Sequence, residues 1–100
     1  MRTYPTKTDK ELVKGISQLK SEKEITSFLR DLLTPTEIEE FSRRFQIAKQ
    51  LWTTDKSYAD IADQVGTSTT TVTRVSHWLY KEPWQGYSVV LERLYGVSKS

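Results

Sequence analysis

A run of hydroxyl side chains between residues 67 and 73 carries the clearest chemical signal in the sequence. Hydroxyl groups can bond phosphate oxygens or the edges of bases, and threonine methyl groups can touch the methyl group of thymine. The run is followed at once by a guanidinium group, which pairs well with anions. The side chains concerned are Thr67, Ser68, Thr69, Thr70, Thr71, Thr73 and Arg74.

Residues suited to catalysis or metal binding are sparse elsewhere in the chain. His77 is the only histidine and there is no cysteine, so we expect neither a metal site nor a Ser/His/Asp triad. The four glycines are scattered and form no phosphate-binding loop. Glu37, Glu39 and Glu40 cluster at the expected start of a helix, where acidic side chains complement the helix dipole. We therefore do not expect an enzyme.

The segment from about residue 57 to residue 80 has the pattern of a helix-turn-helix. Two helices that cross steeply need a small residue at their contact, and a short turn needs a residue that accepts a positive φ. The second helix must also pack on the first through apolar side chains. The residues that fit these roles are Ile61, Ala62, Val65, Gly66, Val72 and Val75. An ordinary helical hairpin within a bundle is the alternative interpretation.

If this segment binds DNA, the start of its second helix enters the major groove. That places the hydroxyl run at the bases, with Thr67 or Ser68 as the cap of the helix. The five β-branched residues 69–73 favour a strand by propensity, but the apolar spacing around them favours a helix. We therefore expect a helix of weak intrinsic stability there.

The rest of the chain indicates further helices and no strand, which makes six helices and an all-α fold. Capping boxes are expected to start the first three helices at Thr8, Ser21 and Thr34. Apolar residues then recur at helical spacing: Leu12, Val13, Ile16 and Leu19; Ile25, Phe28, Leu29 and Leu32; Ile38, Phe41, Phe45, Ala48, Leu51 and Trp52; Tyr87, Val90, Leu91, Leu94 and Tyr95. We expect Trp52 and Trp84 to be core or dimer contacts.

Length and charge limit the interpretation further. One hundred residues make one domain, expected at 8–96 between a flexible arm at 1–7 and a flexible tail at 97–100. A net charge of +2 does not by itself indicate nucleic acid, and residues 57–80 carry −1. Basic residues outside that segment are expected to help: Arg2, Lys7, Lys10, Lys49, Lys56 and Lys81. No apolar run is long enough for a membrane span, and the lack of cysteine fits a reducing cytoplasm.

Several of these residues resemble the tryptophan repressor superfamily, over about residues 9–95. The likeness rests on Leu33–Glu37, Arg44, Gly66 and the run Thr71–Ser76, and the run Gly66–Val75 is similar to the pattern of the TrpR-related YerC/YecD group. The resemblance implies a six-helix TrpR-like fold in an intertwined homodimer, with one helix-turn-helix on each protomer. A shared core would explain the low apolar content of 36%; we expect it to include Phe28, Phe41, Phe45, Leu91 and Leu94.

The resemblance also implies an effector site. In the tryptophan repressor, two arginines flank the indole of the co-repressor and a threonine helps to bind it, which corresponds here to Arg44, Arg74 and Thr34. Two positions depart from the family: Val75 replaces a glycine against which the indole rests, and Trp78 replaces a serine that helps to hold the amino group. We expect no binding of free L-tryptophan in the standard way; either Trp78 fills the site or another ligand is sensed. A plain core role for Trp78 is the alternative.

Together these observations predict a sequence-specific DNA-binding transcription regulator, most simply a repressor. It would act as a homodimer on a double-stranded operator, in the bacterial cytoplasm and on the nucleoid when bound, without metal, membrane or obligatory cofactor. The alternative from another class is a helical dimeric interaction module that keeps the fold but does not bind DNA.

Overall fold

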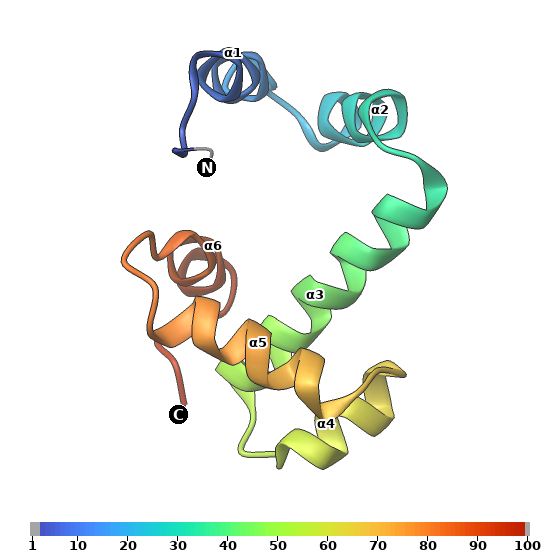
Figure 1. Ribbon diagram of the computed structural model, residues 1–100, viewed down its shortest axis with the longest axis vertical. Coiled ribbons are helices and arrows are strands. Elements are labelled where there is room, and N and C mark those ends of the chain that lie inside the picture. Colours follow the sequence, from blue (N-terminus) through green and yellow to red (C-terminus); the bar gives the residue numbers. More distant parts are fainter. Residues whose placement is uncertain (1–2, 100) are drawn as a thin grey trace. The chain divides into compact units, whose positions relative to one another are not determined.

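The computed structural model describes residues 3–99, which form six α-helices and no strand (Figure 1). The helices are α1 (Lys7–Ile16), α2 (Glu22–Leu32), α3 (Pro35–Thr53), α4 (Tyr58–Val65), α5 (Thr69–Tyr80) and α6 (Gly86–Tyr95). The predicted all-α class and the six helices are confirmed. The chain divides into two compact units, one ending at Ile38 and one beginning at Glu39.

The first helix begins earlier and ends earlier than its sequence pattern suggested. Its cap is Thr6 and not Thr8: the Thr6 hydroxyl accepts from the Asp9 N–H (3.2 Å), and the Asp9 carboxylate accepts from the Thr6 N–H (2.8 Å). Both threonines are followed three residues later by an acidic residue, so the pattern alone left two registers. The helix ends at Ile16, before the predicted apolar position Leu19.

The caps of the next two helices follow the prediction more closely. The Ser21 hydroxyl accepts from the Glu24 N–H (3.1 Å), but the Glu24 carboxylate turns to the Lys20 N–H (2.8 Å) and leaves the box incomplete. At α3 both bonds form: the Thr34 hydroxyl accepts from the Glu37 N–H (3.2 Å), and the Glu37 carboxylate accepts from the Thr34 N–H (2.9 Å). Pro35 occupies the first helical position, where no N–H is needed.

The unit that ends at Ile38 has amphipathic helices without a core of its own. Neither α1 nor α2 contains a buried residue. Their apolar side chains form an exposed set with 40–51% of each surface accessible: Leu12, Val13, Ile16, Ile25, Leu29 and Leu32. A segment of this size lacks the buried area to be stable by itself, so these stripes need a cover.

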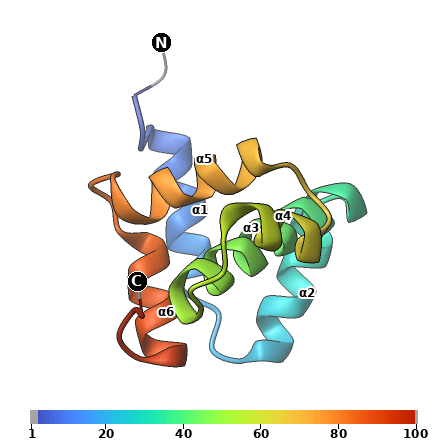
Figure 2. The same ribbon diagram turned by 90° about the horizontal axis from the view of Figure 1, so that it is seen from below.

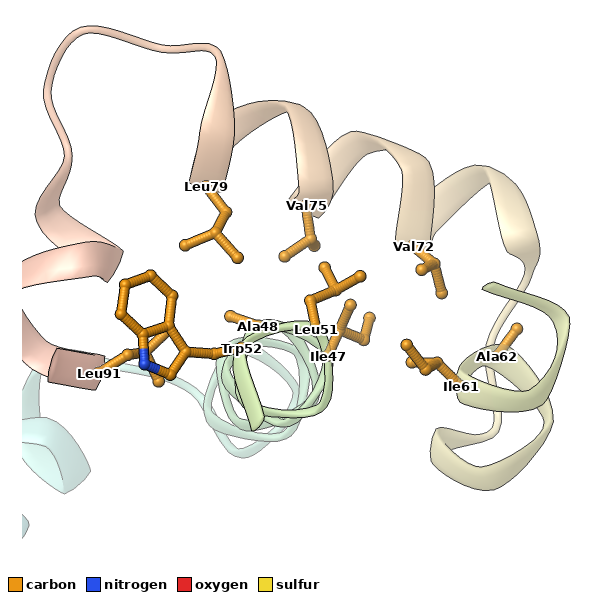
Figure 3. Packing of buried hydrophobic residues seen from close by; sticks show 10 residues of the cluster. All are labelled: Ile47, Ala48, Leu51, Trp52, Ile61, Ala62, Val72, Val75, Leu79 and Leu91. Atoms are coloured by element: carbon orange, nitrogen blue, oxygen red, sulfur yellow. The ribbon is translucent and has the colours of Figure 1, made fainter. Parts of the chain in front are cut away.

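The hydrophobic core lies in the unit that begins at Glu39. Figure 3 shows side chains of α5 lying over the C-terminal half of α3, with α4 completing the cluster on one side and α6 on the other. The buried residues are Ile47, Ala48, Leu51, Trp52, Ile61, Ala62, Val72, Val75, Leu79 and Leu91. Each fully buried aliphatic side chain contributes roughly 1.5–3 kcal/mol to the free energy of folding. This core fixes α4 and α5 on α3.

The end of the chain returns to α3. The Trp52 indole N–H donates to the Gly96 carbonyl (2.7 Å), and the Lys99 N–H donates to the Trp52 carbonyl (3.0 Å). Trp52 is a core residue, as predicted. The mobility expected of residues 1–7 and 97–100 stays a prediction, and Arg2 lies outside the described residues.

Leu91, near the end of the chain, differs from expectation. Leu91, predicted to be shared across a dimer interface, is fully buried within the single chain because it packs in the cluster under α5. Trp84 is 67% exposed and so does not belong to the core of the chain. Phe41 and Leu94, which were also predicted to lie at the dimer interface, are 45% and 58% exposed in the single chain.

Candidate nucleic-acid interface

The turn between α4 and α5 is built around one glycine. Gly66 has a φ of +82° and ψ of 48°, and the N–H groups of Gly66 and Thr67 both donate to the Ala62 carbonyl (2.9 Å each). A Cβ at Gly66 would meet open space, so glycine is needed for its backbone angle and not for close packing. Figure 2 shows α4 and α5 as neighbouring helices joined by this short turn.

The predicted scaffold of the helix-turn-helix is in place. Ile61, Val72 and Val75 are fully buried and Ala62 is 4% exposed. Val65 is partly buried against the same cluster. Figure 3 shows Val72 and Val75 on the face of α5 that is directed toward the core, with Ile61 and Ala62 on α4. The opposite face of α5 is therefore held toward solvent.

Ser68 is the cap of α5. The sequence had allowed either Thr67 or Ser68 in this role. The Ser68 hydroxyl accepts from the Thr71 N–H (3.2 Å) and lies 3.1 Å from the Thr71 hydroxyl. The Thr73 hydroxyl donates to the Thr69 carbonyl (2.9 Å). Three hydroxyls of the run thus stabilise the helix itself, which offsets the low helix propensity of threonine.

The remaining hydroxyls of the run are directed outward. Thr69 and Thr70 are exposed, as is Arg74 one turn later. No side-chain hydrogen bond engages Thr67, Thr69 or Thr70 within residues 3–99. Donors and acceptors at the start of an exposed helix are the arrangement that a helix entering a groove requires.

The predicted effector residues are only partly brought together. The Arg44 guanidinium lies 5.5 Å from the centre of the Trp78 ring and 5.4 Å from that of Phe41, and it bonds the Glu40 carboxylate (2.8 Å). Such cation–π stacking is favourable by about 0.5–1 kcal/mol at a partly exposed site. Burial raises the pKa of the Tyr87 hydroxyl, and the positive charge of Arg44 opposes part of that rise.

Two other members of the predicted effector set lie on other sides of α5. Val75 faces the core and is fully buried. Arg74 is on the exposed side of α5, whereas Trp78 is half buried against the core. Thr34 belongs to the unit that ends at Ile38 and serves there as the cap of α3.

Two contacts of α5 were not foreseen from the sequence. The Tyr58 and Ser76 hydroxyls bond each other across the helix-turn-helix (2.6 Å), and His77 Nε2 lies 3.2 Å from a Glu82 carboxylate oxygen. Ser76 comes one residue after the buried Val75, so the helical period could have predicted that it lies at the edge of the core. The partner Tyr58 was not, because the crossing angle of the two helices selects it.

The described part of the chain holds neither a metal-binding cluster nor a membrane-spanning helix. Among residues 3–99, no cluster of three or more His, Cys, Asp and Glu side chains could hold a metal ion. In the same range, no helix combines the length and the apolar character needed to cross a membrane.

Comparisons with known proteins agree with this geometry. Residues 7–95 match the model of the family described as Trp repressor protein. A crystal structure of a TrpR-like protein from Eubacterium eligens is 36% identical, with a TM-score of 0.80 over 95% of this chain and 96% of that one. A candidate Trp repressor from Staphylococcus aureus is 32% identical, with a TM-score of 0.77 over 89% of this chain and 87% of that one. No curated protein matches the chain. The chain therefore belongs to the Trp repressor family, which consists of transcription regulators and not of enzymes.

Proposed function

We propose that this protein is a sequence-specific, homodimeric DNA-binding regulator that represses transcription by occupying a promoter. Each protomer would place the start of α5 in the major groove of one half-site. Two such helices in a symmetric dimer would lie about 34–36 Å apart, which is one turn of duplex DNA. The operator would then be nearly palindromic, and the protein would act in the bacterial cytoplasm and on the nucleoid.

The observation that carries the proposal is the exposed first turn of α5. Thr69, Thr70 and Arg74 are directed outward, while the Ser68 cap, the Gly66 turn and the core under Val72 place this turn on the surface of the unit. Of the predicted DNA-binding set, we expect Thr67, Thr69, Thr70 and Arg74 to touch DNA, and Ser68, Thr71 and Thr73 to act mainly by stabilising the helix.

A second copy of the chain is the natural cover for the exposed apolar stripes. The unit that ends at Ile38 has no buried residue in either α1 or α2. Phe41, Val90 and Leu94, outside that unit, are also 45–58% exposed. Isolated apolar side chains on a surface are ordinary, but this number in one small chain indicates an interface. The homodimer is supported by this exposure and by the family.

We further propose that free L-tryptophan is not the effector. Trp78 already places an indole ring beside Arg44 (5.5 Å), and Val75 leaves no glycine-like approach to the backbone of α5. The chain would then bind DNA without an added amino acid, or respond to another small molecule. Of the predicted effector set, Arg44 and Trp78, which lie together, are the residues that we propose such a molecule would contact.

The direct test is a gel-shift titration with random and palindromic duplexes at low and moderate salt, with and without amino acids. We expect binding that weakens steeply as salt rises, because phosphate contacts release counterions. A folded dimer that shifts no duplex at low salt would contradict the proposal.

The second candidate function is a dimeric interaction module that has lost DNA binding. It is favoured by one observation: the helix-turn-helix segment 57–80 carries −1, with Asp60 and Asp63 against Arg74. The same gel shift separates the two, since a module of this kind would remain dimeric and leave DNA unbound.

A further inference from the structure

A hollow beside α5 is lined entirely by neutral or basic polar side chains. It lies between the start of α4 and the second half of α5, has a volume of about 460 Å³, and is bounded by Tyr58, Thr73, Ser76, His77, Tyr80 and Lys81. Each of these carries a hydroxyl, an imidazole or an ammonium group, and no carboxylate is among them. The Thr73 and Tyr80 hydroxyls already donate to the Thr69 and Leu51 carbonyls (2.9 and 3.2 Å), so the donors that face a ligand are the Tyr58–Ser76 pair and Lys81. This donor set suits a ligand with several negatively charged oxygen atoms.

The hydroxyl pair at the base of the hollow is preorganised for donation. The Tyr58 and Ser76 oxygens lie 2.6 Å apart, and either can be the donor. Two hydroxyl groups own two hydrogens, and their mutual bond uses one of them. The other hydrogen is available to a ligand oxygen. Because Ser76 is only 9% exposed, the packing of α4 on α5 holds this pair in position.

Positive charge runs along the same side of α5. Arg74, His77 and Lys81 are three, four and seven positions apart and all exposed, so they lie on one face of the helix. That face is opposite the core residues Val72, Val75 and Leu79. Glu82 partly offsets this charge through its interaction with His77 (3.2 Å), while Lys81 stands at the end of the row.

The position of the hollow along α5 indicates which part of a DNA duplex it would meet. His77 is seven positions after Thr70, which is about 10 Å of helix at 1.5 Å per residue. The major groove is about 8.5 Å deep. When the first turn of α5 reaches the bases, the hollow is therefore at the rim of the groove, which is the level of the phosphates.

We propose that this hollow is a binding site for a phosphate of the DNA backbone, held by the Tyr58–Ser76 hydroxyl pair and by Lys81. The inference rests on the proposed function, since it assumes that α5 enters a groove. It adds residues from α4 and from the end of α5 to the DNA-binding surface. It also places positive charge outside residues 57–80, in a chain whose reading segment is itself slightly acidic.

The test compares Lys81→Gln and Tyr58→Phe with a matched control, Lys23→Gln, which removes an exposed lysine of α2. Affinity for a fluorescent duplex would be measured by anisotropy at several salt concentrations, and folding by thermal melting.

Removal of the Lys81 charge should weaken binding roughly tenfold. It should also lower the slope of log affinity against log salt by about 0.9 for each phosphate that the variant no longer neutralises. Tyr58→Phe should weaken binding at all salt concentrations, and the control should match the wild type.

The outcomes separate this inference from the proposed function. A wild-type chain that binds no duplex overturns both. A wild-type chain that binds, together with a folded Lys81→Gln variant of unchanged affinity and salt slope, overturns the phosphate site alone. Titration with inorganic phosphate, followed by the amide NMR shifts around Ser76 and Lys81, gives a further check. If these shifts saturate with phosphate while the DNA affinity of the variants is unchanged, the hollow binds phosphate but not the DNA backbone, and the assignment to DNA is contradicted. If Tyr58→Phe has a lower melting temperature than the wild type, the test of the phosphate site rests on the Lys81→Gln variant.

Discussion

At the scale of single residues, the contact of Arg44 with Trp78 bears on which ligand the predicted effector site could bind. The sequence predicted that an indole at position 78 could fill the space of a ligand, and the structure places that ring 5.5 Å from the guanidinium. Nothing in the sequence indicated Phe41 on the other side of Arg44 (5.4 Å). That contact depends on the rotamer of Arg44, which tertiary packing decides.

Trp78→Ser should therefore open a site that the wild type keeps closed. In calorimetric titrations we expect no heat of binding for L-tryptophan with the wild type and measurable binding with the variant, because the vacated space beside Arg44 is apolar and near a cation. Tyr95→Ser is the control, since it also removes a partly exposed aromatic side chain, and the Tyr95 ring lies beside Lys49 (5.3 Å). Micromolar binding of L-tryptophan by the wild type would refute the account of this site.

Glu37 provides a residue-scale prediction about pH. The Thr34 N–H, and after it the Thr34 hydroxyl, lower the pKa of the Glu37 carboxyl. A group whose pKa falls on folding stabilises the fold above its unfolded pKa, and this contribution is lost as pH falls through the folded value. Glu37→Gln should thus lower the melting temperature at neutral pH, and the difference from the wild type should shrink below about pH 4. A difference that stays constant far below that pH would contradict the capping role of the charge.

At the scale of elements, the sequence predicted all six helices but not every boundary. Ser21 and Thr34 cap their helices as the pattern suggested, and Ser68 is the one of two candidate caps that α5 uses. The start of α1 was wrong because two overlapping boxes compete there, and local spacing cannot rank them.

The turn before α5 gives the sharpest test at this scale. Gly66→Ala should destabilise the protein by about 1–2 kcal/mol, because an alanine at a φ of +82° is strained. Gly86→Ala is the matched control: a Cβ there also meets open space, but the φ is not in the left-handed region. Chemical denaturation of both variants measures the difference. Equal stability of the two would show that the turn does not require glycine.

The helix after that turn is expected to be the least stable element of the core. Threonine-rich α5 has low intrinsic helix propensity, and only one of its faces is buried. Amides 66–76 should exchange hydrogen faster than those of α3 in the free protein and become protected when DNA binds. Protection equal to that of α3 in the free protein would contradict this expectation.

At the scale of the whole molecule, composition predicted that the core of a single chain is incomplete, but it did not predict which residues belong to that core. A content of 36% apolar residues suggested a core shared with a second copy, and the exposed stripes of α1 and α2 support this. Leu91 shows the limit of such reasoning. Its helical spacing matches that of Leu94, yet Leu91 is fully buried and Leu94 is 58% exposed, because the rotation of α6 about its axis is set by packing across the fold.

The central claim is that two copies of this chain bind one DNA duplex through the start of α5. Sedimentation velocity of the protein with a labelled operator-length duplex, at several salt concentrations, measures size and binding together. The account predicts a dimer in the absence of DNA, and a complex of two chains per duplex that dissociates as salt rises. A folded protein that sediments apart from the duplex at about 50 mM salt, a low ionic strength at which phosphate contacts are strong, would contradict it.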